Sequence, residues 1–97
     1  MARVERLSEA EIQSRLSGLS GWSVENGMLQ KKYRFQGFLD GVAFVNRAAQ
    51  VAEEMDHHPD IYIRFGLVTI SLTTHSARGI TALDFEQAAR LDALAAG

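Results

Sequence analysis

The 97-residue chain contains no cysteine, and this absence excludes several kinds of chemistry. Without a thiol there can be no disulfide, no thiolate nucleophile and no cysteine-based zinc site. A large excess of positive or negative charge is also missing, because the formal net charge is −2. The one short basic cluster is Lys31, Lys32 and Arg34. Binding to nucleic-acid phosphates requires a cationic face, so a nucleic-acid partner is not expected.

Long apolar runs are missing as well. Residues 1–6 carry none, so we expect neither a signal peptide nor a membrane anchor, and we expect the protein to be cytoplasmic. Hydrophobic residues make up 46% and charged residues 23% of the chain, which is typical of a globular protein. The length predicts a single domain over residues 1–97 with one modest core.

Capping patterns predict a helix near each end of the chain. Ser8 and Glu11 form a capping box before Ile12 and Leu16, and Gly18 follows the expected end of that helix. Thr81 and Asp84 form a variant of the same box and open a final helix. The apolar positions of this helix are Phe85, Ala88, Ala89 and Leu91.

A third and longer helix is predicted over residues 38–55. Its apolar stripe, at steps of three and four residues, is Phe38, Val42, Val45, Ala49, Ala52 and Met55. Pro59 is the only proline and disfavours helical geometry at His58, so the helix should end near His57.

Two hairpins complete the expected fold. Asn26-Gly27 is a strong turn signal after Val24. The strand that follows alternates, so one of its faces carries Leu29, Lys31, Tyr33 and Phe35, and the other carries Met28, Gln30, Lys32 and Arg34. The second hairpin turns at Gly66, between Ile61, Ile63 and Phe65 and the later Val68, Ile70 and Leu72. The sequence thus predicts an α+β fold, in the order α-β-β-α-β-β-α, with a four-stranded antiparallel sheet and three helices packed on one face.

The three histidines fall at predicted element ends, where functional groups are held rigidly yet remain accessible. His57 and His58 stand where the long helix stops, and His75 follows the last strand. Acidic residues accompany them: Glu53, Asp56 and Asp84. Each also has a purely structural interpretation, since the histidine pair can simply end a helix, Asp84 can serve only as a cap, and Gly79 can supply positive φ in a loop.

A combination of short motifs resembles one known family. The segments are Glu53 to Pro59 (Glu-Glu-Met-Asp-His-His-Pro), Tyr62, Thr73-Thr74-His75, Gly79-Ile80-Thr81 and Asp84-Phe85. Together with Gly21-Trp22, they resemble the pterin-4a-carbinolamine dehydratase family over nearly the whole chain from about Leu7. Ile61 and Tyr62 stand where many relatives carry a larger aromatic pair, and Arg78 stands where a second glycine is frequent.

The resemblance implies dehydration of 4a-hydroxytetrahydropterin to quinonoid dihydropterin, which recycles the pterin cofactor of aromatic amino-acid hydroxylases. It implies His57 and His75 as acids for the leaving hydroxyl, and His58 as a base or pterin-binding group. Residues implied to orient the histidines or line the site are Glu53, Asp56, Thr73, Thr74, Asp84 and, near the rim, Trp22. No metal or other cofactor is implied, and relatives form homodimers and homotetramers.

Three alternatives remain open at this point. His57, His58, His75 and Asp84 could bind a metal ion, although adjacent histidines project in different directions from an extended chain. The domain could instead be a non-catalytic dimerisation module that serves as a transcriptional co-regulator. A third possibility keeps the dehydration but assigns a different pterin, such as one linked to molybdopterin metabolism.

Overall fold

The computed structural model describes residues 4–96, and the predicted order of helices and strands is confirmed. A short 3-10 helix, η1, has no counterpart among the predicted elements. The elements are α1 (Glu9–Leu16), β1 (Ser23–Glu25), β2 (Met28–Arg34), α2 (Phe38–Met55), β3 (Asp60–Arg64), β4 (Leu67–Leu72), η1 (His75–Ala77) and α3 (Ala82–Ala96).

The four strands pair antiparallel in the order β1-β2-β4-β3, so β1 and β3 form the two edges of the sheet. Asn26 and Gly27 connect β1 to β2 with positive φ angles of 53° and 78°. Two consecutive residues in this conformation make a type I′ turn, whose twist matches that of the flanking strands. The predicted first hairpin is therefore confirmed, with Val24 opposite Leu29.

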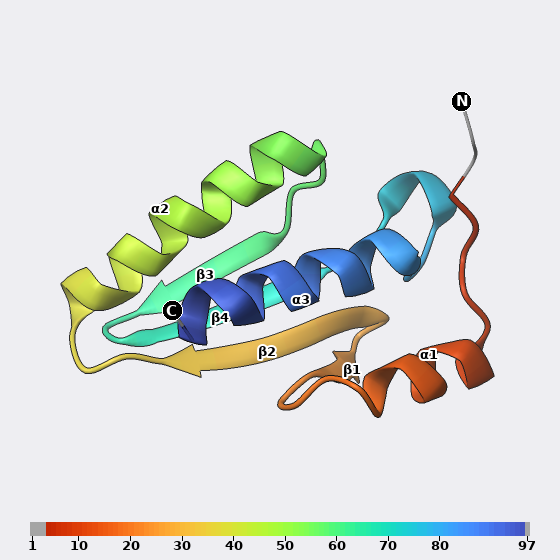
Figure 1. The fold of residues 1–97 in the computed structure, drawn as a ribbon, viewed down its shortest axis with the longest axis horizontal. Helices are drawn as coiled ribbons and strands as arrows, with labels where there is room; N and C mark the ends of the chain where they lie inside the picture. The colour runs from red at the N-terminus through yellow and green to blue at the C-terminus, as the bar shows by residue number, and fades with distance from the viewer. Residues whose placement is uncertain (1–3, 97) are drawn as a thin grey trace.

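The hydrophobic core lies between one face of the sheet and the helices α2 and α3, which contact each other (Figure 1). Leu29 and Tyr33 of β2 are buried on this face, whereas Lys32 and Arg34 on the opposite face are exposed. The two predicted faces of this strand are confirmed. The Tyr33 and Phe44 rings lie 4.7 Å apart between centroids, a separation at which aromatic pairs attract each other.

α1 begins with the predicted capping box. The Ser8 hydroxyl accepts a hydrogen bond from the Glu11 N–H at 3.1 Å, and the Glu11 carboxylate accepts one from the Ser8 N–H at 2.8 Å. These hydrogen bonds, above all the one from the Ser8 backbone, lower the pKa of Glu11. Ile12 and Leu16 then pack against the core, as the apolar stripe predicted.

The stripe predicted for α2 is confirmed at Ala52, but elsewhere it lies about one residue from the buried face. The buried residues of this helix are Gly41, Phe44, Ala48, Val51 and Ala52, whereas the predicted Phe38 and Ala49 are exposed and Val42, Val45 and Met55 are only partly buried. The reason is steric, because a Cβ at Gly41 would lie only 3.3 Å from Val68 Cγ2 and 3.4 Å from Ile63 Cδ1. Small residues let the helix approach the sheet, and Phe44 then fills the core.

The turn between β3 and β4 also differs from the prediction at Phe65. This residue does not continue the inward alternation of Ile61 and Ile63 but lies in the turn, 68% exposed and with φ of 50°. Gly66 follows, and its carbonyl accepts a hydrogen bond from the Phe35 N–H at 2.7 Å. A Cβ on Gly66 would collide with the Phe35 carbonyl group, so close backbone contact explains this glycine.

The predicted cap of α3 is confirmed. The Thr81 N–H donates to Asp84 Oδ2 at 2.8 Å, and the Leu83 N–H donates to Thr81 Oγ1 at 3.2 Å. The apolar assignment is wrong at Ala89, which is exposed. The inward face of the helix instead includes Gln87, which is buried.

No helix within residues 4–96 combines the length and the apolar composition that crossing a membrane requires. The expectation for residues 1–6 falls in part on residues 1–3, which lie outside the described range.

Replacing Gly66 with Ala should destabilise the fold by about 1–3 kcal/mol, because the added methyl group must displace the backbone of Phe35. Urea denaturation gives the change in the free energy of unfolding. Gly18→Ala is the matched control, since its Cβ would meet only Arg15 O at an ordinary 3.6 Å. Equal stability of the two variants would contradict this account of the turn.

Candidate active site

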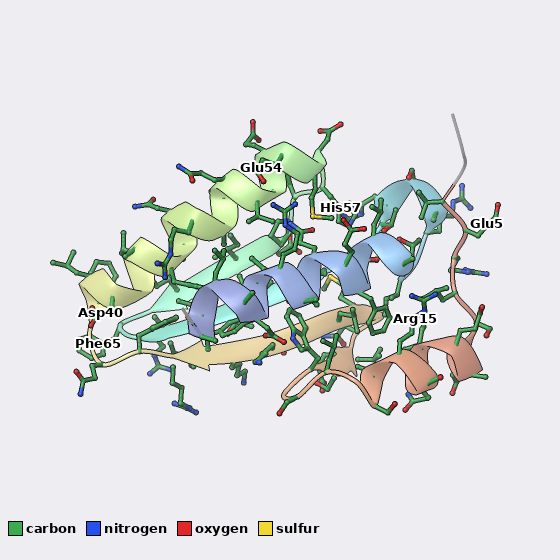
Figure 2. The ribbon with its side chains drawn as sticks, in the orientation of Figure 1. Glu5, Arg15, Asp40, Glu54, His57 and Phe65 are labelled. Atoms are coloured by element: carbon green, nitrogen blue, oxygen red, sulfur yellow. The ribbon has the colours of Figure 1, made fainter. Side chains whose placement is uncertain are left out.

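The site centres on a buried contact between His57 and Asp84. His57, labelled in Figure 2, follows the C-terminal end of α2. Asp84 lies in the first turn of α3, so the contact joins the end of one helix to the start of another. His57 Nε2 lies 2.6 Å from Asp84 Oδ1, with the His57 side chain 10% exposed and the Asp84 side chain fully buried. The pair is thus shielded from the solvent that would weaken its electrostatic attraction.

Two threonines complete the hydrogen bonding of Asp84. Thr74 Oγ1 donates to Asp84 Oδ2 at 2.9 Å and lies 2.7 Å from Thr81 Oγ1. The Thr74 hydroxyl has one proton, which goes to Asp84, so the Thr81 hydroxyl donates to Thr74. Oδ2 also accepts the Thr81 N–H, and Thr74 Oγ1 lies 3.5 Å from His57 Nε2. A fully paired network therefore surrounds one side of the His57 ring.

This network determines which ring nitrogen of His57 is available. Asp84 accepts hydrogen bonds from Thr74 and Thr81, and its remaining oxygen faces His57 Nε2. The contact is satisfied when Nε2 carries the proton and donates it, which fixes the tautomer of the neutral ring. The nitrogen left for chemistry is then Nδ1.

His58 has a different environment. Its Nε2 lies 2.5 Å from Glu53 Oε2, but the two side chains are 55% and 77% exposed. A contact this exposed contributes little to stability. Asp56, by contrast, contributes its backbone: it ends α2 in the left-handed conformation, with φ of 49°, and its N–H donates to Ala52 O and Glu53 O.

His75 opens η1 directly after Thr74 and is exposed. Within the described residues its ring makes no hydrogen bond. Thr73 is partly buried and, by the alternation of an extended chain, points away from the side of Thr74. The structure therefore joins Thr74 to His57 but gives no such contact for Thr73.

The loop after His75 corrects the expectation for Gly79. Arg78, not Gly79, adopts the left-handed conformation, with φ of 60°. Gly79 is explained by a close approach instead, since a Cβ there would collide with the side chain of Arg6.

Trp22 belongs to another polar cluster, centred on Asp92. The Asp92 carboxylate accepts hydrogen bonds from Trp22 Nε1, from Lys31 Nζ at 2.8 Å and from the Tyr33 hydroxyl at 2.6 Å. Burial, together with the hydrogen bond to Asp92 and its charge, raises the pKa of Tyr33 and keeps the phenol a donor. Among residues 4–96, the Trp22 side chain hydrogen-bonds to Asp92 and not to His57, His58 or His75.

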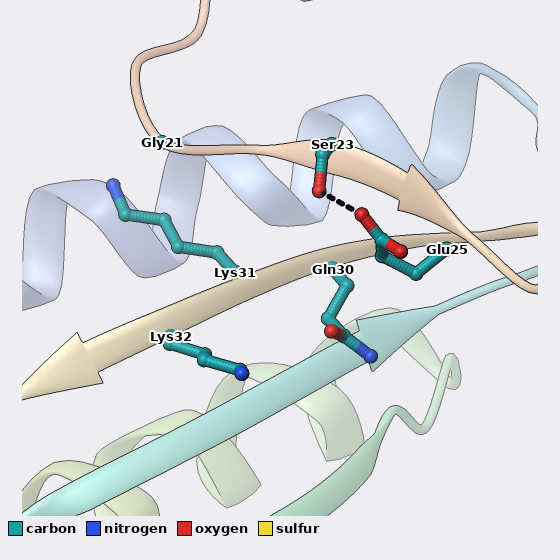
Figure 3. Close-up of a pocket in the computed structure, with 6 residues that line it drawn as sticks. All are labelled: Gly21, Ser23, Glu25, Gln30, Lys31 and Lys32. Atoms are coloured by element: carbon teal, nitrogen blue, oxygen red, sulfur yellow. Dashed lines mark hydrogen bonds between the residues drawn. The ribbon is translucent and has the colours of Figure 1, made fainter.

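A surface hollow of about 390 Å³ lies over β1 and β2, away from the histidines (Figure 3). It is lined by Gly21, Ser23, Glu25, Gln30, Lys31 and Lys32. None of the histidines and acids discussed above lines this hollow.

The metal-binding alternative gains no support from the geometry. In the described range, no group of three or more histidine, aspartate or glutamate side chains has an arrangement that could hold a metal ion. His57 and His58 instead contact different carboxylates.

Two residues at the site were not predicted. The Thr81 hydroxyl was expected only to cap a helix, yet it also donates to Thr74. Gln87 Nε2 donates to the His57 carbonyl oxygen at 2.8 Å. A possible signal for Gln87 is its spacing, since it lies three residues after Asp84 on the inward side of α3, where an apolar residue is the usual choice.

Comparisons with known proteins agree with this architecture. The family described as pterin 4 alpha carbinolamine dehydratase matches residues 5–94. A Solibacter usitatus protein of the same description is 52% identical over 95% of this chain and 97% of its own length. A crystal structure described as a transcriptional coactivator/pterin dehydratase from Brucella melitensis is 33% identical and superposes with a TM-score of 0.90, covering 94% of this chain and 99% of that one.

A more distant structural neighbour is a pterin dehydratase-like protein described as a RuBisCO assembly factor in the alpha-carboxysome. It is 29% identical, with a TM-score of 0.63 over 76% of this chain and 86% of its own. The matches to the family and to the more similar relatives extend over nearly the full length of the chain. The chain therefore belongs to the pterin-4a-carbinolamine dehydratase family and is a hydro-lyase that removes water from a pterin carbinolamine.

Proposed function

We propose that the dehydration proceeds by histidine general acid and base catalysis, with His57 and His75 as acids and His58 as a base or pterin-binding group. In the reaction the bond between C4a and the hydroxyl oxygen breaks, and the oxygen takes a proton and leaves as water. A ring nitrogen of the pterin gives up a proton, and the electron pair forms the new double bond of the quinonoid dihydropterin. Histidine suits both transfers because its unperturbed pKa of about 6.5 is close to neutral pH.

The observation that carries this proposal is the buried contact between His57 Nε2 and Asp84. When His57 is protonated, both ring nitrogens carry a proton, and Asp84 engages only the one on Nε2. The proton on Nδ1 is then the one that His57 transfers to the leaving hydroxyl. Asp84 orients the ring and stabilises the imidazolium, the role that a buried aspartate has beside histidine in a Ser-His-Asp triad.

The exposed histidines would complete the proton transfers. His58 is oriented by Glu53 and lies next to His57 in the chain, so it is suited to contact the pterin ring or accept its proton. His75 lies beside Thr74, which belongs to the network of His57. Roles in pterin binding for Asp56, Thr73 and Trp22 rest on the resemblance to the family alone.

We also propose that the product supports aromatic amino-acid hydroxylases, whose pterin cofactor the family recycles. A pterin linked to molybdopterin metabolism would need the same proton transfers, so the physiological substrate is a separate question from the mechanism. Comparing turnover of the 4a-carbinolamines of tetrahydrobiopterin and of other tetrahydropterins would distinguish them.

Replacing His57 or His75 with Ala should lower kcat by about 10²-fold or more for at least one stereoisomer of the 4a-carbinolamine, because a positioned acid is lost. If the two histidines serve opposite faces of the ring, each single variant can spare one isomer. Both isomers should therefore be assayed, and the double variant should turn over neither.

Asn46→Ala, at an exposed position of α2, serves as the control for truncation at the surface. Thermal unfolding should show all variants folded. A folded double variant with wild-type rates on both isomers would contradict the proposal and favour a non-catalytic role. Loss of folding would instead make the histidines structural.

Asp84→Asn should lower kcat by about 10²-fold or more, since the amide cannot accept hydrogen bonds at both ends and the tautomer of His57 is no longer fixed. Stability should also fall, by about 1–3 kcal/mol, because a buried donor meets the amide nitrogen. Asp92→Asn is the matched control on the same helix, as Asp92 also accepts hydrogen bonds from three residues.

Both variants should lose stability, but kcat of the folded protein should fall only for Asp84→Asn. An equal decrease in kcat for the two would show that general loosening of the fold, and not the orientation of His57, determines the rate.

We propose further that the protein is a homodimer or homotetramer. β1 and β3 are the edges of the sheet, and their unpaired backbone groups favour pairing with another copy. Light scattering at micromolar concentration should give a mass of at least twice 10.7 kDa. A single species at the monomer mass would refute this.

A further inference from the structure

Gln87 combines full burial with a direct contact to the backbone of the central histidine. Gln87 lies within α3, one helical turn after Asp84, and is 0% exposed. Its Nε2 donates a hydrogen bond to the carbonyl oxygen of His57 at 2.8 Å. The same face of α3 thus contacts both the ring and the backbone of His57.

His57 is consequently held at three points. Its N–H donates to Ala52 O at 3.0 Å, its carbonyl accepts from Gln87, and its ring contacts Asp84. The carbonyl is the point that fixes His57 to α3 independently of the ring. Without it, only the ring contact with Asp84 would join His57 to α3.

The other end of the Gln87 amide is unusual. Oε1 is buried and has no hydrogen-bond partner among the described residues. The amide cannot simply be reversed, since that would point Oε1 at the His57 carbonyl and bring two acceptors together. A buried acceptor without a partner costs free energy, which an apolar side chain of similar volume would avoid. Packing of the core alone therefore does not explain a glutamine at this position.

We propose that Gln87 is a positioning residue, whose hydrogen bond to the His57 carbonyl holds the imidazole in the orientation that dehydration requires. This rests on the proposed role of His57 as an acid. Gln87 does not contact the pterin in this proposal and acts only through His57. Its removal should therefore change the rate of the chemical step and leave substrate binding nearly unchanged.

The test replaces Gln87 with Met, which keeps the length and approximate volume but removes both polar atoms. Displacement of a catalytic group by about 1 Å can cost about 10²-fold in rate, so we expect kcat to fall by about tenfold or more. KM should stay within about twofold, because no substrate contact is lost. Gln50→Met, the same change at an exposed position of α2, is the matched control and should leave both constants unchanged.

A second measurement is independent of activity. In ¹⁵N NMR spectra of the imidazole rings, Gln87→Met should shift the signals of His57 and leave those of His58 and His75 in place. Unchanged His57 signals or a wild-type kcat in the folded variant would overturn the inference. If Gln87→Met does not fold, Gln87→Leu is measured in the same way, and failure of both to fold would also overturn it, because the residue would then serve the fold.

The inference and the proposed function can fail separately. If His57→Ala keeps wild-type turnover of both isomers, the proposed acid is wrong, whatever Gln87 does. If His57→Ala is impaired but folded Gln87→Met is not, the acid stands and only the positioning role is lost.

Discussion

The buried contact between His57 and Asp84 links the fold of this protein to its site. The same carboxylate caps α3 through the Thr81 N–H, accepts the Thr74 hydroxyl after β4 and faces the His57 ring after α2. Three segments distant in sequence therefore converge on one group. Loss of any one donor leaves a buried carboxylate oxygen with fewer hydrogen bonds, which typically costs about 1–3 kcal/mol. The geometry of the ring and the packing of the helices cannot vary independently.

Local features of the fold could be predicted because short-range chemistry determines them. The turn at Asn26-Gly27 and the caps at Ser8 and Thr81 involve residues within four positions of each other. The buried face of α2 was missed because it depends on the surface of the sheet. Gly41 and Ala48 are small residues that a hydrophobic pattern does not mark as core. Their role is seen only where α2 packs against β3 and β4, because their small size allows the close approach.

At the site, too, some features are local in the sequence and others depend on distant contacts. The sequence placed His57, His58 and His75 at element ends, and the contact of Glu53 with His58 spans only five positions. The contact of His57 with Asp84 spans 27 positions and that with Gln87 spans 30, so neither follows from local pattern. Asp84 was expected as a helix cap and, by resemblance, as a residue lining the site, but its burial against the His57 ring and the hydrogen bond from Gln87 to the His57 backbone are seen only in the structure.

Asp84 and Asp92 lie on the same helix but face different kinds of donor. Both carboxylates accept hydrogen bonds from three residues, and both lie on the same helix. The donors to Asp92 are a lysine, a tyrosine and a tryptophan: the positive charge of Lys31 is directly paired, and the raised pKa of Tyr33 keeps its phenol neutral. At Asp84 one donor is an imidazole, whose second nitrogen the carboxylate cannot reach. The contact with Asp84 therefore orients the imidazole and leaves its second nitrogen free of that carboxylate, as the proposed proton transfer requires, whereas the lysine and tyrosine on Asp92 offer no such second nitrogen.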